Sequence, residues 1–268
     1  MNRINTYKIK LLSSFIICSI MSVILFSSCD NFENNQQTPA YIKVSGFKVV
    51  MNPNISYQQD DGFLTNNITD VWLYVDNEFL GVYSLPTDTN KPLVIPILKE
   101  GKHVIQLRPG VKWNGMAATR EYYRFYTYEN DTVDLVSGQT ITIPTQNITY
   151  NNYATFAMVD LFEDTYNHFQ DDTTSKKRRK ITSNNLHIIS NDSVKYGHSC
   201  GAMYMNSESS SFKILSKDSI SCSNQNAMIL ELDYHCNIPF EVGVYGRTSS
   251  SSSQRSFISS VRLKSNVN

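Results

Sequence analysis

Residues 68–86 have the sequence ITDVWLYVDNEFLGVYSLP, and this stretch decides the fold. Within residues 71–75 (VWLYV) every second side chain is aliphatic, which is the two-residue period of a β-strand with one buried face. Residues 76–78 (DNE) supply a turn, and residues 79–85 return as a second strand. The stretch therefore predicts a β-hairpin within an antiparallel sheet.

Further short strands are predicted on both sides of this hairpin, with turn residues between them. They lie at 42–51, 93–98, 103–108, 121–127 and 140–143. Gly46 introduces a slip into the first strand. Pro96 places the 93–98 strand at a sheet edge, because proline lacks the N–H that a central strand donates. About seven short strands separated by turns are typical of a β-sandwich, which we expect over residues 41–148.

The composition agrees with an all-β fold class. The 268 residues include 16 Tyr and 13 Phe, and aromatic residues favour strands. Lys plus Arg and Asp plus Glu number 24 each, so the formal net charge is zero. This balance argues against a nucleic-acid partner, which requires a positively charged face. The basic run at 176–180 (KKRRK) follows two aspartates and is interpreted as a solvated loop.

The first 28 residues have the organisation of a signal peptide. Basic residues precede the uncharged apolar run 11–26, and small residues follow it. A transmembrane anchor is the alternative, but a span needs about 20 apolar residues and this run is shorter. Residues 25–29 (LFSSC) resemble the lipobox of bacterial lipoproteins, in which the cysteine is the residue that receives the lipid.

The lipobox resemblance implies that residues 1–28 are removed and that Cys29 carries a lipid, with palmitate among its acyl chains. Stable anchoring takes at least two such chains. Residues 29–40 are polar and are expected to form a lipidated tether between the membrane and the folded part. The Tyr-, Asn- and Ile-rich sequence resembles Bacteroidota lipoproteins, which implies a place in the cell envelope, at the outer membrane or the cell surface.

Part of residues 41–148 resembles the prealbumin-like and PEGA-type modules of secreted bacterial proteins. Val75, Asp76 and Gly81 occupy the places of the family's hairpin, and residues 98–110 (LKEGKHVIQLRPG) those of its next strand. The resemblance implies a spacer or an interaction unit more often than an enzyme.

Two aromatic features of this module are candidate ligand contacts. Trp113 adjoins a turn pair, residues 114–115 (NG), where it either contacts a ligand or folds back as a lid on the core. The predicted 121–127 strand and its continuation would place a polar aromatic row on one face. That row is Tyr122, Arg124, Tyr126 and Tyr128. It either stacks against sugar rings or a partner, or forms an ordinary outer face.

Residues 149–268 resemble a galactose-binding-like jelly roll, a fold of carbohydrate-binding modules. Residues 162–164 (FED) match the family's opening landmark, and residues 198–204 (HSCGAMY) match a later strand. The resemblance implies a structural calcium ion, for which Glu163 or Asp164 would supply hard oxygen ligands. It also implies strands beyond residue 246 that the remaining sequence does not match, so we expect a module truncated at its C-terminus or closed differently.

A polar face is predicted on a hairpin over residues 230–245, in which Cys236 pairs with Phe240. Its members would be Glu231, Asp233, His235, Glu241 and Tyr245. An ordinary solvated face, a sugar-binding face and a metal site each agree with this pattern. Such carboxylates accept hydrogen bonds from sugar hydroxyls, and the tyrosine stacks on a ring.

No short catalytic signature is present in the sequence, and the three cysteines expected in the mature chain match no zinc spacing. They are Cys200, Cys222 and Cys236, among which no disulfide pairing is predicted. The expected function is therefore a non-enzymatic, lipid-anchored binding module for a glycan or an envelope protein, without a cofactor apart from the calcium. The alternative is a structural, assembly or adhesin subunit of an envelope complex.

Overall fold

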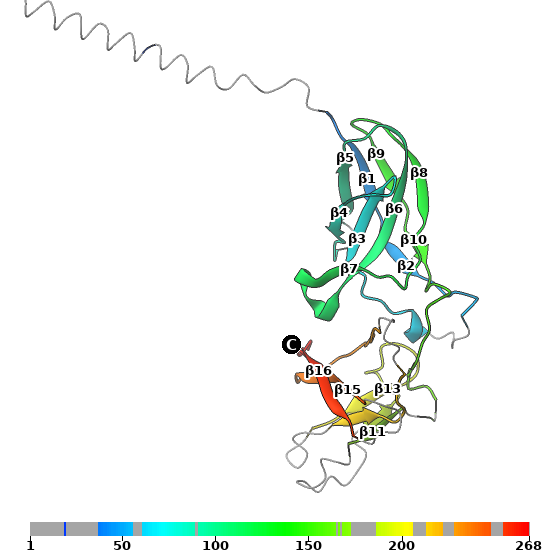
Figure 1. Ribbon diagram of the computed structural model, residues 1–268, viewed down its shortest axis with the longest axis vertical. Helices are drawn as coiled ribbons and strands as arrows, with labels where there is room; N and C mark the ends of the chain where they lie inside the picture. Colours follow the sequence, from blue (N-terminus) through cyan, green and yellow to red (C-terminus); the bar gives the residue numbers. More distant parts are fainter. Residues whose placement is uncertain are drawn as a thin grey trace, which may run out of the picture.

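The computed structural model describes Ser19 and residues 37–55, 61–88, 91–164, 166, 168–172, 186–205, 213–221, 228–247 and 254–267 (Figure 1). Apart from Ser19, the predicted signal peptide lies outside these residues, as do Cys29 and most of the tether. From residue 37 onward the described regular structure consists of β-strands and short 3-10 turns. The all-β fold class is therefore confirmed.

The strands have the following bounds. They are β1 (Ala40–Val44), β2 (Phe47–Val49), β3 (Asp70–Val75), β4 (Glu78–Ser84), β5 (Leu93–Ile97), β6 (Gly101–Lys112), β7 (Arg120–Tyr122), β8 (Asn130–Leu135), β9 (Thr140–Ile143), β10 (Gln146–Ile148), β11 (Phe169–Asp171), β12 (Leu186–Ile189), β13 (Cys200–Met203), β14 (Ile214–Ser216), β15 (Phe240–Gly246) and β16 (Ser256–Leu263). The 3-10 turns are η2 (Asp61–Leu64), η3 (Trp113–Gly115) and η4 (Ala117–Thr119).

Strand β6 organises the first half of the chain. It pairs with β3 along one edge, and on its other edge it pairs first with β8 and then with β7. Strand β4 extends this sheet beyond β3, so the predicted hairpin is confirmed. A second sheet has the order β5-β1-β9, in which β5 lies at the edge, as Pro96 predicts.

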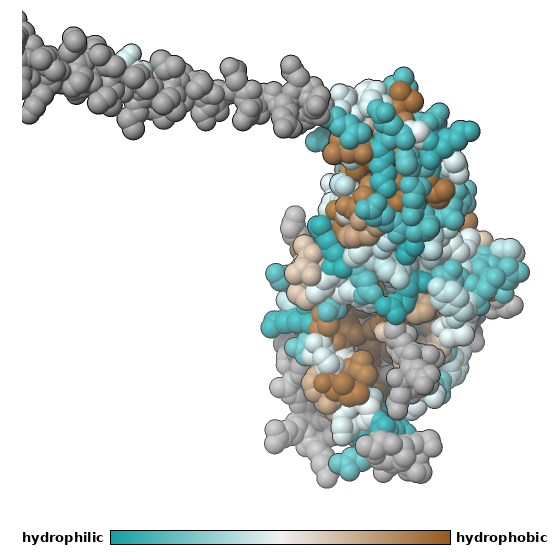
Figure 2. Space-filling model, turned by 45° about the horizontal axis from the view of Figure 1, so that its top comes forward, coloured by the Kyte–Doolittle hydropathy of each residue, from teal (hydrophilic) through white to brown (hydrophobic). Residues whose placement is uncertain are grey.

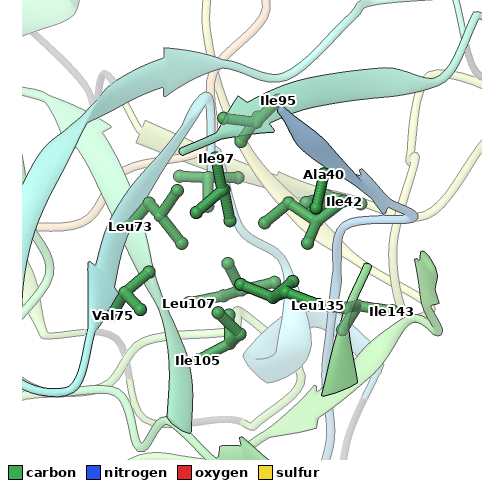
Figure 3. Close-up of a cluster of buried hydrophobic side chains, with 12 residues drawn as sticks. Ala40, Ile42, Leu73, Val75, Ile95, Ile97, Ile105, Leu107, Leu135 and Ile143 are labelled. Carbon is green, nitrogen blue, oxygen red and sulfur yellow. The ribbon is translucent and has the colours of Figure 1, made fainter. Parts of the chain in front are cut away.

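Aliphatic side chains from these two sheets meet in one buried cluster (Figure 3). The alternating residues of β3 point into it, as do alternating residues of β1, β5 and β6. Its buried members are Ala40, Ile42, Val44, Val71, Leu73, Val75, Ile95, Ile97, Ile105, Leu107, Leu135 and Ile143. Each fully buried aliphatic side chain contributes about 1.5–3 kcal/mol. The two-residue period of apolar side chains in these strands therefore produces the core that holds the two sheets together.

Gly46 redirects the chain between β1 and β2, at the position where the sequence predicted a slip within one strand. Its φ of +100° lies in the left-handed region that glycine enters without a steric penalty. Before this residue β1 pairs in parallel with β9, and after it β2 pairs in parallel with β10. The two short strands therefore belong to different sheets, although they are nearly continuous in sequence.

The β3–β4 turn is fixed by side chains that hydrogen-bond to β6. Asp76 and Asn77 have φ values of 53° and 67°, the conformation of a two-residue hairpin turn. The Asp76 carboxylate accepts the Val104 N–H at 3.0 Å and contacts His103 Nδ1 at 2.6 Å. The second imidazole nitrogen of His103 lies 2.9 Å from the carbonyl oxygen of Glu100. Both nitrogens face acceptors, so the geometry favours the charged imidazolium.

This arrangement predicts a pH-dependent stability. The hydrogen bond to Asp76 and that to the Glu100 carbonyl raise the pKa of His103, while the Val104 N–H and His103 lower the pKa of Asp76. The stabilisation is complete below the ordinary histidine pKa of about 6.5 and is lost as pH rises through the raised folded value. In urea unfolding, His103→Gln should lower stability more at about pH 5.5 than at about pH 9. An equal loss at both values would contradict this assignment.

The second half of the chain is built differently from the first. Its described strands form the pairs β11–β14, β12–β13 and β15–β16, each a two-stranded antiparallel sheet. Among the described residues, the two buried clusters draw their fully buried members from residues 40–150. Large hydrophobic side chains of β15 and β16 are exposed, including Val244, Phe257 and Ile258.

Two predicted elements are wrong. The strand expected over residues 121–127 ends at Tyr122, where β7 stops and the chain turns. The hairpin expected over residues 230–245 does not form, because Phe240 of β15 pairs with Leu263 of β16 and not with Cys236. Local alternation predicted the strand β15 correctly, but the nearest apolar segment in sequence is not its partner.

Candidate functional site, a tyrosine–arginine hollow

A hollow of about 370 Å³ opens where the outer face of β6 meets the turn that follows β7. We call it the tyrosine–arginine hollow. It is lined by Arg108, Pro109, Tyr122, Tyr123, Arg124, Tyr126, Thr127, Tyr128, Asn151 and Tyr153. Five of these ten residues are tyrosines and two are arginines, so aromatic rings and positive charge dominate the lining.

Backbone hydrogen bonds shape the turn that forms one wall. The Tyr123 N–H donates to the Pro109 carbonyl at 2.7 Å, and the Tyr126 N–H donates to the Tyr123 carbonyl at 3.1 Å. The Asn151 side-chain amide then donates to the carbonyls of Arg124 and Tyr126, at 2.9 and 3.0 Å. These bonds bend residues 123–127 away from the predicted strand and hold the bend in place.

Arg108 lies among aromatic rings on the outer face of the β6 sheet. Its guanidinium carbon is 4.1 Å from the ring centre of Tyr74, 4.4 Å from that of Tyr128 and 5.5 Å from that of Tyr122. Cation–π attraction of this kind contributes about 0.5–2 kcal/mol per contact. Arg108 Nη2 donates to Gln106 Oε1 at 3.0 Å, whereas the buried Nε has no acceptor among the described residues.

Arg124 is positioned through Glu121 and Trp113. Its Nη2 contacts Glu121 Oε1 at 2.8 Å, and Trp113 Nε1 donates to Glu121 Oε2 at 2.8 Å. The hydrogen bonds from Arg124 and then Trp113 lower the pKa of Glu121. Trp113 is half-buried in η3 and is not one of the lining residues. Its indole N–H instead holds the carboxylate that orients Arg124.

Tyr128 and Tyr153 present the most accessible rings of the hollow. Their side chains are 41% and 67% exposed, respectively. The Tyr153 hydroxyl donates to the Arg124 carbonyl at 2.8 Å and accepts a bond from the Asn151 amide at 2.8 Å. The Tyr153 ring is thereby fixed at its polar end while its faces stay open to solvent.

The inner side of the hollow adjoins a second buried cluster. Tyr123, Tyr126 and Tyr150 pack there with aliphatic residues of β2 and β10, and the centres of the Tyr123 and Tyr126 rings are 4.7 Å apart. Burial is the largest cause that raises the pKa of each of these three phenols, and the charge of Glu231 raises each pKa further. These hydroxyls therefore remain protonated donors.

Glu231, a predicted sugar ligand, instead joins the two halves of the chain. Its carboxylate accepts hydrogen bonds from the hydroxyls of Tyr123 and Tyr150, the latter at 2.9 Å. Asp233 similarly accepts a hydrogen bond from Thr65, next to η2. Both carboxylates thus bind the first half of the chain.

The other residues of the predicted polar face are dispersed. His235 is exposed in a segment without regular structure, and Glu241 lies opposite Arg262 in the β15–β16 pair. The Tyr245 hydroxyl is 2.5 Å from Lys213 Nζ. Because β15 has a different partner from the predicted one, these side chains do not form one face with Glu231 and Asp233.

The predicted calcium ligand Glu163 binds backbone amides. One carboxylate oxygen accepts the N–H groups of His198 at 2.6 Å and Ser199 at 2.9 Å, and these bonds lower the pKa of Glu163. Asp164, the other predicted calcium ligand, also has a hydrogen-bonding or electrostatic partner. Within the described ranges, no group of three or more His, Cys, Asp or Glu residues is arranged to hold a metal ion.

The two segments predicted as jelly-roll landmarks, residues 162–164 and 198–204, nevertheless lie in contact. Besides the bonds from Glu163, the Phe162 ring approaches Gly201 so closely that a Cβ there would lie 2.8 Å from it. Cys200 and Cys236 are not joined in a disulfide, and Cys222 lies outside the described residues.

Comparison with known proteins identifies no relative: no family model, curated sequence or solved structure matches this chain. The part of the chain that the structure describes contains no helix with the length and hydropathy of a membrane span.

Several residues of the hollow were not predicted as a site. The sequence pointed to Tyr122, Arg124, Tyr126 and Tyr128 as an aromatic row, but Tyr126 is buried and the row does not follow a strand. Arg108, Asn151 and Tyr153 were missed. In the sequence these three residues are recognisable only as polar or aromatic residues beside predicted strands. That pattern does not show that they meet in one hollow.

The position of Glu231 gives a testable stability effect. Glu231→Ala should lower the free energy of unfolding by about 1–3 kcal/mol, because two largely buried phenols lose their acceptor. Glu129→Ala removes an exposed carboxylate elsewhere and is the matched control. Urea unfolding of both variants makes the comparison, and equal stabilities would refute the structural role of Glu231.

Proposed function

We propose that this protein is a non-enzymatic, lipid-anchored envelope protein that binds a glycan in the tyrosine–arginine hollow. The observation that carries the proposal is the pair of accessible rings, Tyr128 and Tyr153, beside two fixed guanidinium groups. Cys29 would carry the lipid and residues 29–40 the tether. The location is then the outer membrane or the cell surface.

The hollow has the chemistry that sugar binding requires. Aromatic faces stack on the apolar C–H side of a sugar ring, and tyrosine also offers a polar edge. A concave site with many apolar contacts and a few fixed polar groups gives a small ligand both affinity and orientation. Arg124, held by Glu121, is such a fixed group.

The lining also supports binding rather than catalysis. None of its ten residues carries a carboxylate, an imidazole or a thiol, the groups most often used for acid–base or nucleophilic chemistry. The proposed role is therefore to retain a ligand at the envelope and not to transform it.

Two sandwich modules, residues 41–148 and 149–268, complete the proposed architecture. The face-to-face packing of the β6 sheet and the β5-β1-β9 sheet supports the first. The contact of Phe162 and Glu163 with residues 198–201 supports a jelly-roll origin for the second, because the family's landmarks meet there.

A second candidate function, an assembly or adhesin subunit of an envelope complex, is favoured by a different observation. Figure 2 shows hydrophobic residues gathered on the surface in the lower half of the view. Phe257 and Ile258 of β16 are 57% and 64% exposed. A stoichiometric protein that co-purifies in mild detergent would favour this function, especially if Ile258→Asp abolishes its recovery.

The binding site is tested with a glycan array followed by calorimetry on its best ligand. Tyr128→Ala and Tyr153→Ala should each weaken binding by about two- to tenfold, because each removes one stacking face. Tyr204→Ala removes an exposed tyrosine of the second half and should leave affinity unchanged. Absence of any ligand on the array, or equal effects of the three variants, would refute a glycan site in the hollow.

The anchor is tested separately by metabolic labelling. Wild-type protein expressed in a bacterial host should incorporate labelled palmitate and fractionate with membranes. Cys29→Ala should lose the label and retain the leader, because the thiol that accepts the lipid is gone. Cys200→Ala is the control and should label as the wild type does. A Cys29→Ala protein that still labels would contradict the anchor.

A further inference from the structure

The charge balance of the tyrosine–arginine hollow is incomplete. Its lining contains two arginines and no acidic residue. Arg124 is neutralised by Glu121, which lies 2.8 Å away. Arg108 has no such partner, since no carboxylate of a described residue lies within 4.0 Å of its guanidinium.

The neighbours of Arg108 hold the cation without neutralising it. The rings of Tyr74, Tyr122 and Tyr128 contact the guanidinium, and its hydrogen-bond acceptor is the neutral amide oxygen of Gln106. Placing a cation against aromatic side chains removes part of its hydration, and an anion that enters the hollow would restore the lost interaction. A ligand with a negative charge is therefore favoured over a neutral ligand of the same shape.

The geometry of Arg108 also suits a particular kind of anion. A guanidinium is planar, and two of its parallel N–H groups match the two oxygens of a carboxylate. In Arg108 the buried Nε and the Nη2 bond to Gln106 leave Nη1 and the second N–H of Nη2 for such an anion. The aromatic contacts and the bond to Gln106 restrict its motion, so little conformational entropy remains to be lost on binding. Arg108 covers one face of the Tyr128 ring, and the exposed parts of Tyr128 and Tyr153 lie in the same hollow and would hold the sugar ring.

We infer that the hollow selects an acidic sugar, with the ligand's oxyanion bound by Arg108 and its ring stacked on Tyr128 or Tyr153. This inference rests on the proposed glycan function and adds the chemical class of the ligand. Arg124 contributes shape and hydrogen bonding, whereas Arg108 contributes the unbalanced charge.

The test compares two ligands that share one sugar backbone, an oligogalacturonide and its uncharged methyl ester, by calorimetry with the full mature chain. The acid should bind about 10- to 100-fold more tightly than the ester, the range of one charge-assisted hydrogen-bonded pair. Its affinity should also fall with added salt, whereas that of the ester should not.

The variants assign this difference to one residue. Arg108→Gln should remove the preference for the acid, and Arg108→Lys should restore part of it, because lysine keeps the charge but not the planar fork. Arg262→Gln, the same charge change on the exposed edge of β16, should bind as the wild type does. Thermal unfolding checks that each variant folds. The comparison of acid and ester binding to the wild-type protein does not depend on the variants.

The outcomes separate this inference from the proposed function. Equal affinity for acid and ester, or preference for the acid that persists in a folded Arg108→Gln protein, would overturn the role of Arg108 while the glycan function stands. A sulfated oligosaccharide that binds while both galacturonides fail would overturn the carboxylate assignment. Failure of every glycan on the array would refute the proposed function itself.

Discussion

The central constraint in this molecule is the pairing of β6 along both of its edges. One face of the strand supplies Ile105 and Leu107 to the buried core, so its position relative to β3 and β8 is fixed by burial and by hydrogen bonds. The opposite face carries Arg108, whose neighbours are the outward tyrosines of β3 and β7. The period of two in a β-strand thus connects the core directly to the hollow, because burying Leu107 necessarily turns Arg108 outward.

The sequence predicted the parts of the fold that depend on local alternation. The β3–β4 hairpin, the slip at Gly46 and the edge position of β5 follow from side-chain period, glycine and proline, each of which acts within a few residues. The turn after Tyr122 could not be predicted in this way. It depends on the Asn151 amide, which is more than twenty residues away and reaches the carbonyls of residues 124 and 126. A tyrosine-rich segment without that bond has every local property of a strand.

The candidate site shows the same division. Aromatic and carboxylate residues were recognised in the sequence as chemically interesting, but their partners were not. Glu231 and Asp233 were expected to face a ligand, whereas they accept hydrogen bonds from hydroxyl groups of the first half of the chain. Strand alternation predicts which side chains share a face only when the strand and its partner are both correct. Here β15 pairs with β16, and the resulting surface differs from the predicted one.

The bond between Tyr123 and Glu231 has a consequence for how the two halves of the chain communicate. Tyr123 lines the hollow and holds Glu231 with its hydroxyl, so a single residue belongs both to the cavity wall and to the junction. An occupant that restrained Tyr123 would also restrain the junction, and by thermodynamic reciprocity a load that pulls the halves apart would then lower affinity in the hollow. At the end of the proposed tether, such a coupling would make ligand retention sensitive to mechanical tension.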